Sequence, residues 1–282
     1  MDKKIAIVCN PTAAGQKSVE VGRYVAAELE ARGVAYVLHT AFWPDAFIGC
    51  TQVWICGGDG TLNYFINKYP HISLPLFLFK GGTGNDFAWL LYGNDSLVDQ
   101  LERALRRQET VLVDAGLCNG RLFLNGVGIG FDGLVVHELL GKPKRPGKAS
   151  YLLTVLKHLV QYKEGGAQIV MDDRQWNEPL FMLSVANGKR YGGGFIVAPD
   201  ACLQDGKLDV VLITAIKHLQ RLQYLNLIEA GKHLGLAQVR VHQSKAVQVQ
   251  TVTATTAHID GEPLRASEYH ISCLPKKFVF VR

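Results

Sequence analysis

The stretch Val53-Trp54-Ile55-Cys56-Gly57-Gly58-Asp59-Gly60-Thr61-Leu62-Asn63 decides the fold of the first part of this chain. An apolar run that stops at glycines is typical of a buried parallel strand that ends in a tight turn. Three glycines within four positions allow positive φ angles and keep Cβ atoms away from a ligand. Thr61 is placed to cap a following helix, whose free N–H groups would form a phosphate site. A glycine-rich turn without a ligand is the alternative that this stretch leaves open.

Strands and helices alternate around this stretch. The predicted strands cover residues 5–9, 34–38, 52–56 and 74–79. This alternation predicts a parallel α/β sheet, in which ligands bind beyond the carboxyl ends of the strands. Three loops follow strand ends, Asn10–Gly15, Gly57–Asn63 and Gly81–Asp86. We therefore expect these loops to converge at one edge of the sheet.

The pattern changes after residue 113. Short strands and turn signals then recur closely, which predicts an antiparallel sandwich or barrel. Helical patterns interrupt it at residues 149–161 and 219–233. The sequence thus predicts an α/β domain with a parallel sheet over residues 1–113 and a β-rich, antiparallel sandwich-like domain over 114–282. Whether the last residues return to the first domain stays open.

Composition sets broad limits on the function. The chain has 282 residues, of which 48% are hydrophobic and 20% charged, as in soluble globular proteins. A net charge of +5 fits an anionic ligand or membrane surface without requiring either. The cysteines show no metal-type spacing, which favours buried free thiols in a reducing cytoplasm. They are Cys9, Cys50, Cys56, Cys118, Cys202 and Cys273.

Two glycine-rich loops together resemble a known family. Gly57–Asn63 and Gly82–Ala88 are similar to the nucleotide loops of the diacylglycerol kinase catalytic-domain family, which includes sphingosine and ceramide kinases. The distantly related NAD kinases share the first loop. Three later blocks, Asn125–Gly133, Ala186–Val210 and His258–Pro263, also resemble the family in its order. NAD kinases lack the last two blocks in this form, so the resemblance favours a lipid kinase.

The resemblance implies a reaction. An enzyme of this kind moves the γ-phosphate of ATP, with Mg²⁺, to a lipid hydroxyl, here first of all diacylglycerol or a related glycerolipid. Residues 1–113 would bind the nucleotide and residues 114–282 the lipid, with the active site in the cleft between the two domains. The alternatives are a sphingoid or ceramide-type acceptor, an NAD-kinase-like enzyme, and a non-catalytic nucleotide-binding regulator.

The nucleotide contacts are also implied by the resemblance. They are Asn10, Pro11, Thr12, Ala13, Ala14, Thr40, Gly57, Gly58, Asp59, Gly60, Thr61, Leu62, Asn63 and Thr83. Loop N–H groups and the hydroxyls of Thr61 and Thr83 are suitable donors to phosphate. For Thr40, an ordinary strand end is the alternative. Lys80 stands where the family has a proline, either as a further phosphate contact or as an exposed side chain.

Carboxylates are implied at the reaction centre. Asp59 cannot donate to phosphate, so we expect it to hold Mg²⁺ or orient the acceptor, unless it only caps a backbone N–H. The family implies Glu262 as the base that accepts the proton of the lipid hydroxyl, with Asp260 beside it. A plain β-turn would explain Asp260-Gly261 but would not require Glu262. Asp86 begins a predicted helix, where capping alone would explain it.

A second, structural Mg²⁺ is implied by the resemblance at Asp205. The carboxylate of Asp205 would bind it together with the main-chain carbonyls of Cys202 and Lys207, since Mg²⁺ prefers oxygen ligands. A hairpin turn at Asp205-Gly206 is the alternative.

Membrane contact is suggested by a basic, proline-containing loop over residues 142–148 that precedes an amphipathic helix. Each Lys or Arg near anionic lipid adds about 1 kcal/mol, enough for transient docking, although a solvated loop is the commoner fate of such a run. We expect a cytoplasmic protein with peripheral contact at the inner membrane face, a lipid substrate and no nucleic-acid partner. A homodimer stays open.

Overall fold

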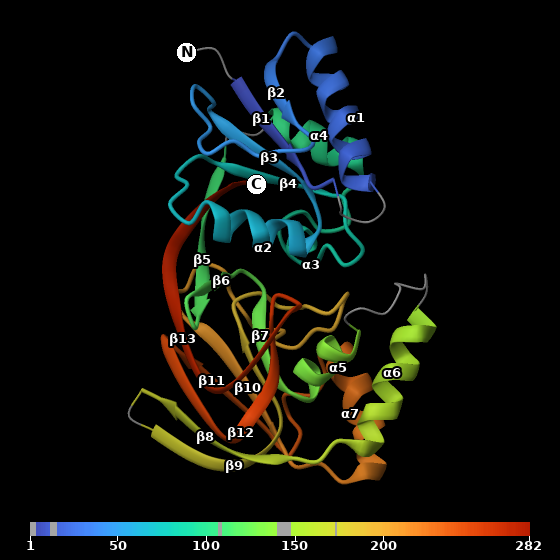
Figure 1. The fold of residues 1–282 in the computed structure, drawn as a ribbon, viewed down its shortest axis with the longest axis vertical. Helices are drawn as coiled ribbons and strands as arrows, with labels where there is room; N and C mark the ends of the chain where they lie inside the picture. The colour runs from blue at the N-terminus through green and yellow to red at the C-terminus, as the bar shows by residue number, and fades with distance from the viewer. Residues whose placement is uncertain (1–3, 12–15, 107–108, 140–147, 173) are drawn as a thin grey trace. The chain divides into compact units, whose positions relative to one another are not determined.

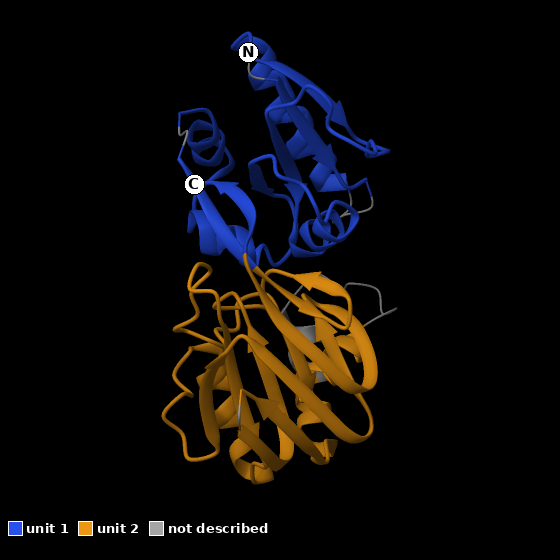
Figure 2. Cartoon of the chain, turned by 90° about the vertical axis from the view of Figure 1, so that its left-hand side faces the viewer, with its two compact units in different colours: residues 1–114, 276–282 blue, residues 115–275 orange. Residues whose placement is uncertain are grey.

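The computed structural model describes residues 4–11, 16–106, 109–139, 148–172 and 174–282. The chain divides into two compact units (Figure 2). Unit 1 comprises Met1–Asp114 and Lys276–Arg282, and unit 2 comprises Ala115–Pro275. The last residues of the chain therefore group with unit 1. The predicted location of the active site between the domains stays a prediction.

Unit 1 contains the predicted parallel sheet with its helices (Figure 1). Its elements are β1 (Lys4–Cys9), α1 (Lys17–Ala31), β2 (Ala35–His39), β3 (Gln52–Gly57), α2 (Asp59–Lys68), β4 (Leu76–Lys80), α3 (Asp86–Tyr92) and α4 (Leu97–Arg106). The strands pair in the parallel order β2–β1–β3–β4. At the other edge of β4, Phe280 near the chain end pairs with Leu76, also in parallel. The α/β prediction is confirmed.

The deciding stretch folds nearly as its sequence predicts, with one difference. All of β3 is buried, as expected for a strand of a parallel sheet with both faces covered. Helix α2 begins at Asp59, because Gly58 takes the extended conformation of the N-cap residue. Thr61 therefore does not cap the helix. It lies within the first turn and is only 3% exposed.

Unit 2 is β-rich and antiparallel, as predicted. Its elements are β6 (Arg121–Phe123), β7 (Gly126–Gly130), α5 (Phe131–Leu139), α6 (Lys148–Gln161), β8 (Gly165–Met171), β9 (Arg174–Ala186), β10 (Leu208–Thr214), α7 (His218–Glu229), β11 (Val239–Ser244) and β12 (Ala246–Ile259). Two strands, β5 (Thr110–Cys118) and β13 (Glu262–Val281), have residues in both units. The order is β11–β10–β9–β7–β12–β13, and β8 pairs with both β9 and β12.

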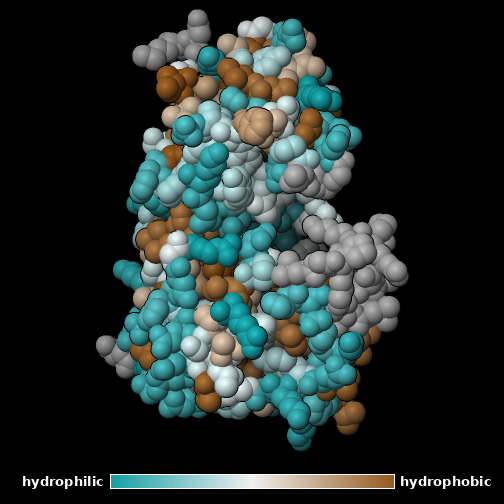
Figure 3. Space-filling model, viewed as in Figure 1, coloured by the Kyte–Doolittle hydropathy of each residue, from teal (hydrophilic) through white to brown (hydrophobic). Residues whose placement is uncertain are grey.

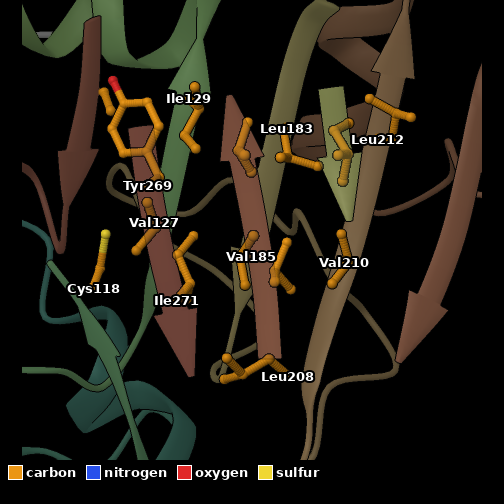
Figure 4. Packing of buried hydrophobic residues seen from close by; sticks show 14 of the residues in the cluster. Cys118, Val127, Ile129, Leu183, Val185, Leu208, Val210, Leu212, Tyr269 and Ile271 are labelled. Carbon is orange, nitrogen blue, oxygen red and sulfur yellow. The ribbon is translucent and has the colours of Figure 1, made fainter. Parts of the chain in front are cut away.

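Unit 2 has two hydrophobic cores, one on each face of its central strands. Along β10, Val210 and Leu212 belong to one core and Val211 and Ile213 to the other, which is the period of two expected for a strand. The first core lies among the strands (Figure 4). The second core includes residues of α5, α6 and α7. These helices therefore cover one face of the sheet.

Helix α5 was not predicted. The sequence indicated two helices in this half of the chain, and the described residues form three. Gly130, with φ +101°, ends β7 and allows the turn directly into the helix. Phe131 and Val135 then pack one face of α5 into the second core. The glycine-rich sequence before the helix masked this pattern. Within the described ranges, no helix is long and apolar enough to span a membrane.

Candidate active site

The three predicted loops converge in unit 1. Asn10, Gly57 and Gly81 lie at or just after the carboxyl ends of β1, β3 and β4, which are adjacent in the sheet. The N–H of Gly81 donates to the carbonyl of Gly57 at 2.9 Å. Asn10 Nδ2 lies 3.5 Å from Thr61 Oγ1. The described first residues of all three loops therefore lie at one edge of the parallel sheet.

The glycines of these loops are needed because the backbones touch. A Cβ atom on Gly58 would lie 2.7 Å from Gly82 Cα, and one on Gly82 would lie 2.4 Å from Gly58 Cα. A Cβ on Gly57 would lie 2.5 Å from the side chain of Thr61. The close approach leaves main-chain N–H groups at the start of α2 beside the second loop. This arrangement fits an anionic phosphate group.

The predicted nucleotide contacts differ in accessibility. Pro11, Gly60 and Thr83 are exposed, and Asn10, Thr40 and Asp59 are partly exposed. The buried positions are Gly57, Gly58, Thr61, Leu62 and Asn63. Thr61, Leu62 and Asn63 are buried residues of α2, so they would support a nucleotide site without facing solvent. Thr12, Ala13 and Ala14 lie outside the described residues. All of these contacts stay predictions.

Asp59 joins the two glycine-rich loops. Its Oδ2 accepts a hydrogen bond from the N–H of Asp86 at 3.0 Å, and its Oδ1 accepts one from the N–H of Phe87 at 2.9 Å. The carboxylate therefore caps the start of α3, which is the structural alternative that the sequence left open. The metal or acceptor role of Asp59 stays a prediction.

Lys80 makes two contacts that were not considered from the sequence, and its contact with phosphate stays a prediction. Its Nζ donates to the carbonyl of Gly93 at 2.8 Å and to that of Asp95 at 3.0 Å. Carbonyl groups at the end of a helix lack hydrogen-bond partners within the helix. Lys80 provides a donor for two such carbonyls just after α3. The side chain is thus directed at the end of α3.

In unit 2, Asp260 organises the turn between β12 and β13. Its Oδ1 accepts from the N–H groups of Asn125 and Gly126, and its Oδ2 accepts from Leu124, each at 2.9 Å. Asp260 has φ +49° and is 9% exposed. Glu262, two residues later, is exposed. The geometry favours a positioning role for Asp260 and leaves Glu262 as the carboxylate available to a substrate.

Unit 2 also contains a cavity that the sequence did not indicate. Its cavity volume is about 60 Å³. Its walls are mainly apolar and come from α5, α6, α7 and β9. Representative wall residues are Phe131, Val135, Val155, Leu159, Phe181 and Ile228. Helices α5, α6 and α7 thus enclose a mainly apolar space against the sheet.

Three polar residues line this cavity together: Asp132, Tyr191 and His258. Tyr191 donates its hydroxyl to Asp132 Oδ2 at 2.8 Å. His258 Nε2 faces the same oxygen at 3.6 Å. A Cβ on Gly128 would lie 1.9 Å from Asp132 Oδ2 and 2.5 Å from His258 Nε2, so this glycine makes room for the group. All three residues lie in blocks that resemble the family, but only the tertiary structure brings them together.

A further lining residue, Arg221, is 1% exposed and holds α6 to α7. Its Nη1 donates to the carbonyls of Leu159 and Tyr162, and its Nη2 pairs with Glu164 at 2.7 Å. A buried guanidinium with these partners is satisfied within the protein. Arg221 therefore fixes the cavity wall.

The predicted structural metal site lies at a cluster of carboxylates in unit 2. Asp205 Oδ1 accepts the N–H of Lys207 at 3.0 Å, as in the turn considered from the sequence. Gln243 Nε2 lies 3.4 Å from Asp205 Oδ2 and 3.2 Å from Asp209 Oδ1. Asp209 Oδ2 is buried without a hydrogen-bond partner among the described residues. Burial raises the pKa of Asp209, and the nearby Asp205 carboxylate adds to this shift.

This oxygen-rich cluster fits a hard cation such as Mg²⁺. Among the described residues, no three His, Cys, Asp or Glu side chains are grouped as metal ligands. A metal here would thus depend on main-chain oxygens, as predicted for Cys202 and Lys207. The thiol-bearing side chain of Cys202 is exposed. The site stays a prediction.

Two family profiles cover most of the chain. Residues 4–118 match the diacylglycerol kinase catalytic domain, and residues 125–281 match the YegS C-terminal NAD kinase beta sandwich-like domain. A protein named "Probable lipid kinase YegS-like" from Yersinia pestis (strain Pestoides F) is 30% identical over 241 residues, covering 82% of this chain and 78% of that protein. A protein of the same name from Xanthomonas oryzae pv. oryzae (strain MAFF 311018) is 28% identical over 242 residues, covering 81% and 78%.

Solved structures are similar over almost the whole chain. One is described as "a putative diacylglycerol kinase from Bacillus anthracis str. Sterne", with a TM-score of 0.79 and 23% identity, covering 99% of this chain and 95% of that chain. A second structure of the same description has a TM-score of 0.76 at 22% identity, covering 99% and 97%. At these identities the likeness shows the fold.

Proposed function

Since the chain belongs to the diacylglycerol kinase catalytic-domain family and is a lipid kinase, we propose that it transfers the γ-phosphate of ATP to a hydroxyl of diacylglycerol or a related glycerolipid. Mg²⁺ would take part in the reaction, as in phosphoryl transfer generally. The glycine-rich loops of unit 1 are the candidate nucleotide site. The turn that carries Glu262 is the candidate acceptor site.

The observation that carries this proposal is the apolar cavity of unit 2 with its polar group of Asp132, Tyr191 and His258. Burial of an acyl chain contributes about 0.8 kcal/mol for each CH₂ group. A lipid that carries a hydroxyl could exchange hydrogen bonds with these polar residues, because carboxylate, phenol and imidazole groups all form them. This combination supports a lipid acceptor.

Each group of the candidate site would have a different role in phosphoryl transfer. The backbone N–H groups at the start of α2 would hold phosphate oxygens, and bound Mg²⁺ would neutralise their charge. Asp59 is the candidate to orient a metal-bound water. Glu262 would accept the proton from the attacking hydroxyl, because it is the exposed carboxylate of its turn. Asp260 would fix the turn through its three backbone hydrogen bonds.

A sphingoid base is the second candidate acceptor. The carboxylate of Asp132 in the cavity lining would attract the ammonium group of such a lipid. An NAD-kinase-like acceptor is less favoured, because the cavity walls are mainly apolar. A non-catalytic nucleotide-binding regulator is also less favoured. A protein that had lost catalysis would be expected to lack one of the carboxylates Asp59, Asp205 and Glu262, and all three are present.

Peripheral contact with a membrane is part of the proposal. Of the predicted basic loop over residues 142–148, residues 142–147 lie outside the described residues. Exposed apolar side chains on α6 and α7 support such contact: Leu219 is 98% exposed, Val160 70% and Leu222 46%. Figure 3 shows hydrophobic surface at the lower right, where α7 lies in Figure 1. Lys157 and Lys217, also exposed, would face anionic headgroups. A homodimer stays an untested prediction.

A direct assay tests the proposal. Purified protein is incubated with Mg²⁺, γ-labelled ATP and micelles that contain dioleoylglycerol, sphingosine or ceramide, and in parallel with NAD. We expect label in the phosphorylated glycerolipid, and none without Mg²⁺. Label only in a sphingoid product would show that the acceptor is a sphingoid lipid and not a glycerolipid. Label only in the NAD product would show that the enzyme phosphorylates NAD and not a lipid. No labelled product from any acceptor would overturn the proposal.

A further inference from the structure

The turn that carries Glu262 is held from two sides. On one side Asp260 accepts three backbone N–H groups from residues 124–126. On the other side, the N–H of Gly261 donates to His258 Nδ1 at 3.3 Å. Because Glu262 is exposed, packing in the interior does not fix its side chain. The conformation of the turn therefore sets the direction in which this side chain extends. His258 is thus one of two anchors of the candidate base.

His258 also belongs to the cavity. It is 2% exposed and lines the cavity together with Asp132 and Tyr191. The ring of Tyr191 meets the imidazole edge-on, with 4.8 Å between the ring centres. Because Nδ1 accepts the N–H of Gly261, the proton of a neutral imidazole is on Nε2, the nitrogen that faces Asp132. One ring therefore contacts the cavity through one nitrogen and the turn through the other.

We infer that His258 is a positioning residue that couples occupancy of the unit 2 cavity to the direction of Glu262. A lipid whose polar group contacts Asp132 or Tyr191 restrains the imidazole, and the imidazole restrains Gly261 and the turn. Gly128 is required for this arrangement, since a Cβ there would overlap both Asp132 Oδ2 and His258 Nε2. The inference rests on the proposed function for the role of Glu262, but its structural part is independent of catalysis.

Two variants of His258 separate the two contacts. The side-chain oxygen of Asn occupies nearly the position of Nδ1, so His258→Asn keeps an acceptor for Gly261 and loses the group that faces Asp132. The longer Gln reaches the position of Nε2, so His258→Gln keeps the cavity contact and loses the acceptor for Gly261. Tyr191→Phe is a third variant, which removes the donor to Asp132 and leaves both nitrogens of His258 in place.

The first measurement is hydrogen exchange at the Gly261 amide, with and without dioctanoylglycerol and without ATP. We expect the lipid to slow this exchange in the wild type. In His258→Gln the amide should exchange about twofold to tenfold faster, since a hydrogen bond contributes about 0.5–1.5 kcal/mol and about 1.4 kcal/mol is tenfold, and the lipid should have no effect. His258→Asn should keep the basal protection but lose the response to lipid. Equal exchange in the wild type and His258→Gln would overturn the inference.

Steady-state kinetics provide the second measurement. His258→Gln should lower kcat roughly tenfold to a hundredfold, because a displaced base reacts poorly, with the KM for ATP unchanged. Tyr191→Phe should mainly raise the KM for lipid. An inactive wild type would overturn the proposed function, while the exchange data would still decide the coupling. An active wild type with His258→Gln at full kcat would overturn the coupling alone.

Discussion

Asp59 in unit 1 and Asp260 in unit 2 make similar contacts in two different kinds of site. Each carboxylate accepts backbone N–H groups from a loop distant in sequence, 27 and 28 residues away for Asp59 and 134 to 136 residues away for Asp260. Around Asp59 the candidate site consists of glycine backbone. Around Asp260 it consists of side chains, namely Glu262, His258, Asp132 and Tyr191.

The difference follows from what each unit is proposed to bind. Phosphate oxygens are bound well by main-chain N–H groups, which glycines bring close. A lipid hydroxyl needs a base and an apolar wall, which only side chains supply. We therefore expect ligand binding in unit 1 to be weakened by atoms added to the glycines of its loops. In unit 2 we expect the activity to be lowered by changes in the functional groups of the side chains. The following variants test this contrast.

The largest effect is expected for Glu262→Gln. A positioned base contributes about 10²–10⁴-fold to turnover, so kcat should fall by that factor while the KM for ATP stays the same. Glu268→Gln is the matched control, because it removes the same charge from an exposed position on the same strand. Turnover of Glu262→Gln equal to that of the control would show that Glu262 is not the base.

Gly58→Ala tests the backbone site of unit 1. The new Cβ would lie 2.7 Å from Gly82 Cα and push the two loops apart. Overpacking costs about 1–3 kcal/mol, so the Kd for ATP should rise roughly tenfold to a hundredfold. Titration calorimetry with ATP and Mg²⁺ measures this directly. Gly165→Ala is the control, since no atom lies within 4 Å of its added Cβ, and unchanged ATP binding in Gly58→Ala would refute a nucleotide site at these loops.

Asp260→Asn should destabilise the protein more than Asp59→Asn. The Asn side chain has one acceptor oxygen, so at least one of the three buried N–H groups now bonded to Asp260 would face an NH₂ group. A buried group left unsatisfied costs about 1–3 kcal/mol. Asp59 is partly exposed, and water can replace a lost contact there. Urea unfolding of both variants checks the order, and a larger loss for Asp59→Asn would contradict it.

The smallest effect is expected for Leu219→Ser. Loss of an apolar side chain that enters a bilayer surface only in part should weaken binding to vesicles about threefold to tenfold, since full burial of Leu is worth roughly 1.5–3 kcal/mol. Sedimentation with vesicles of phosphatidylcholine and phosphatidylglycerol measures it. Val252→Ser, at an 87% exposed position on β12, serves as the control. Equal binding of both variants would exclude this face of α7 from membrane contact.

Much of the fold could be read from local pattern. The apolar run 53–56 followed by glycines is unambiguous because both faces of a parallel strand are buried. Short strands after residue 113 likewise indicated the antiparallel part. Helix α5 was missed because its glycine-rich approach, up to Gly130, is typical of a loop as well as of a strand end. Helix α7 ends at Glu229, before the predicted end, and Gly231 follows with φ +68°.

The candidate site, like the fold, was predictable from the sequence only in part. The sequence by itself pointed to the candidate residues, because glycine loops and an Asp-Gly-Glu turn are local patterns. Only the tertiary structure decided what they contact: Asp59 caps α3, Lys80 satisfies carbonyls, and Asp260 binds a loop more than a hundred residues away. The group of Asp132, Tyr191 and His258 was likewise beyond the sequence. Hydrogen bonds and packing between segments depend on distances in space, which the spacing of residues along one chain does not encode.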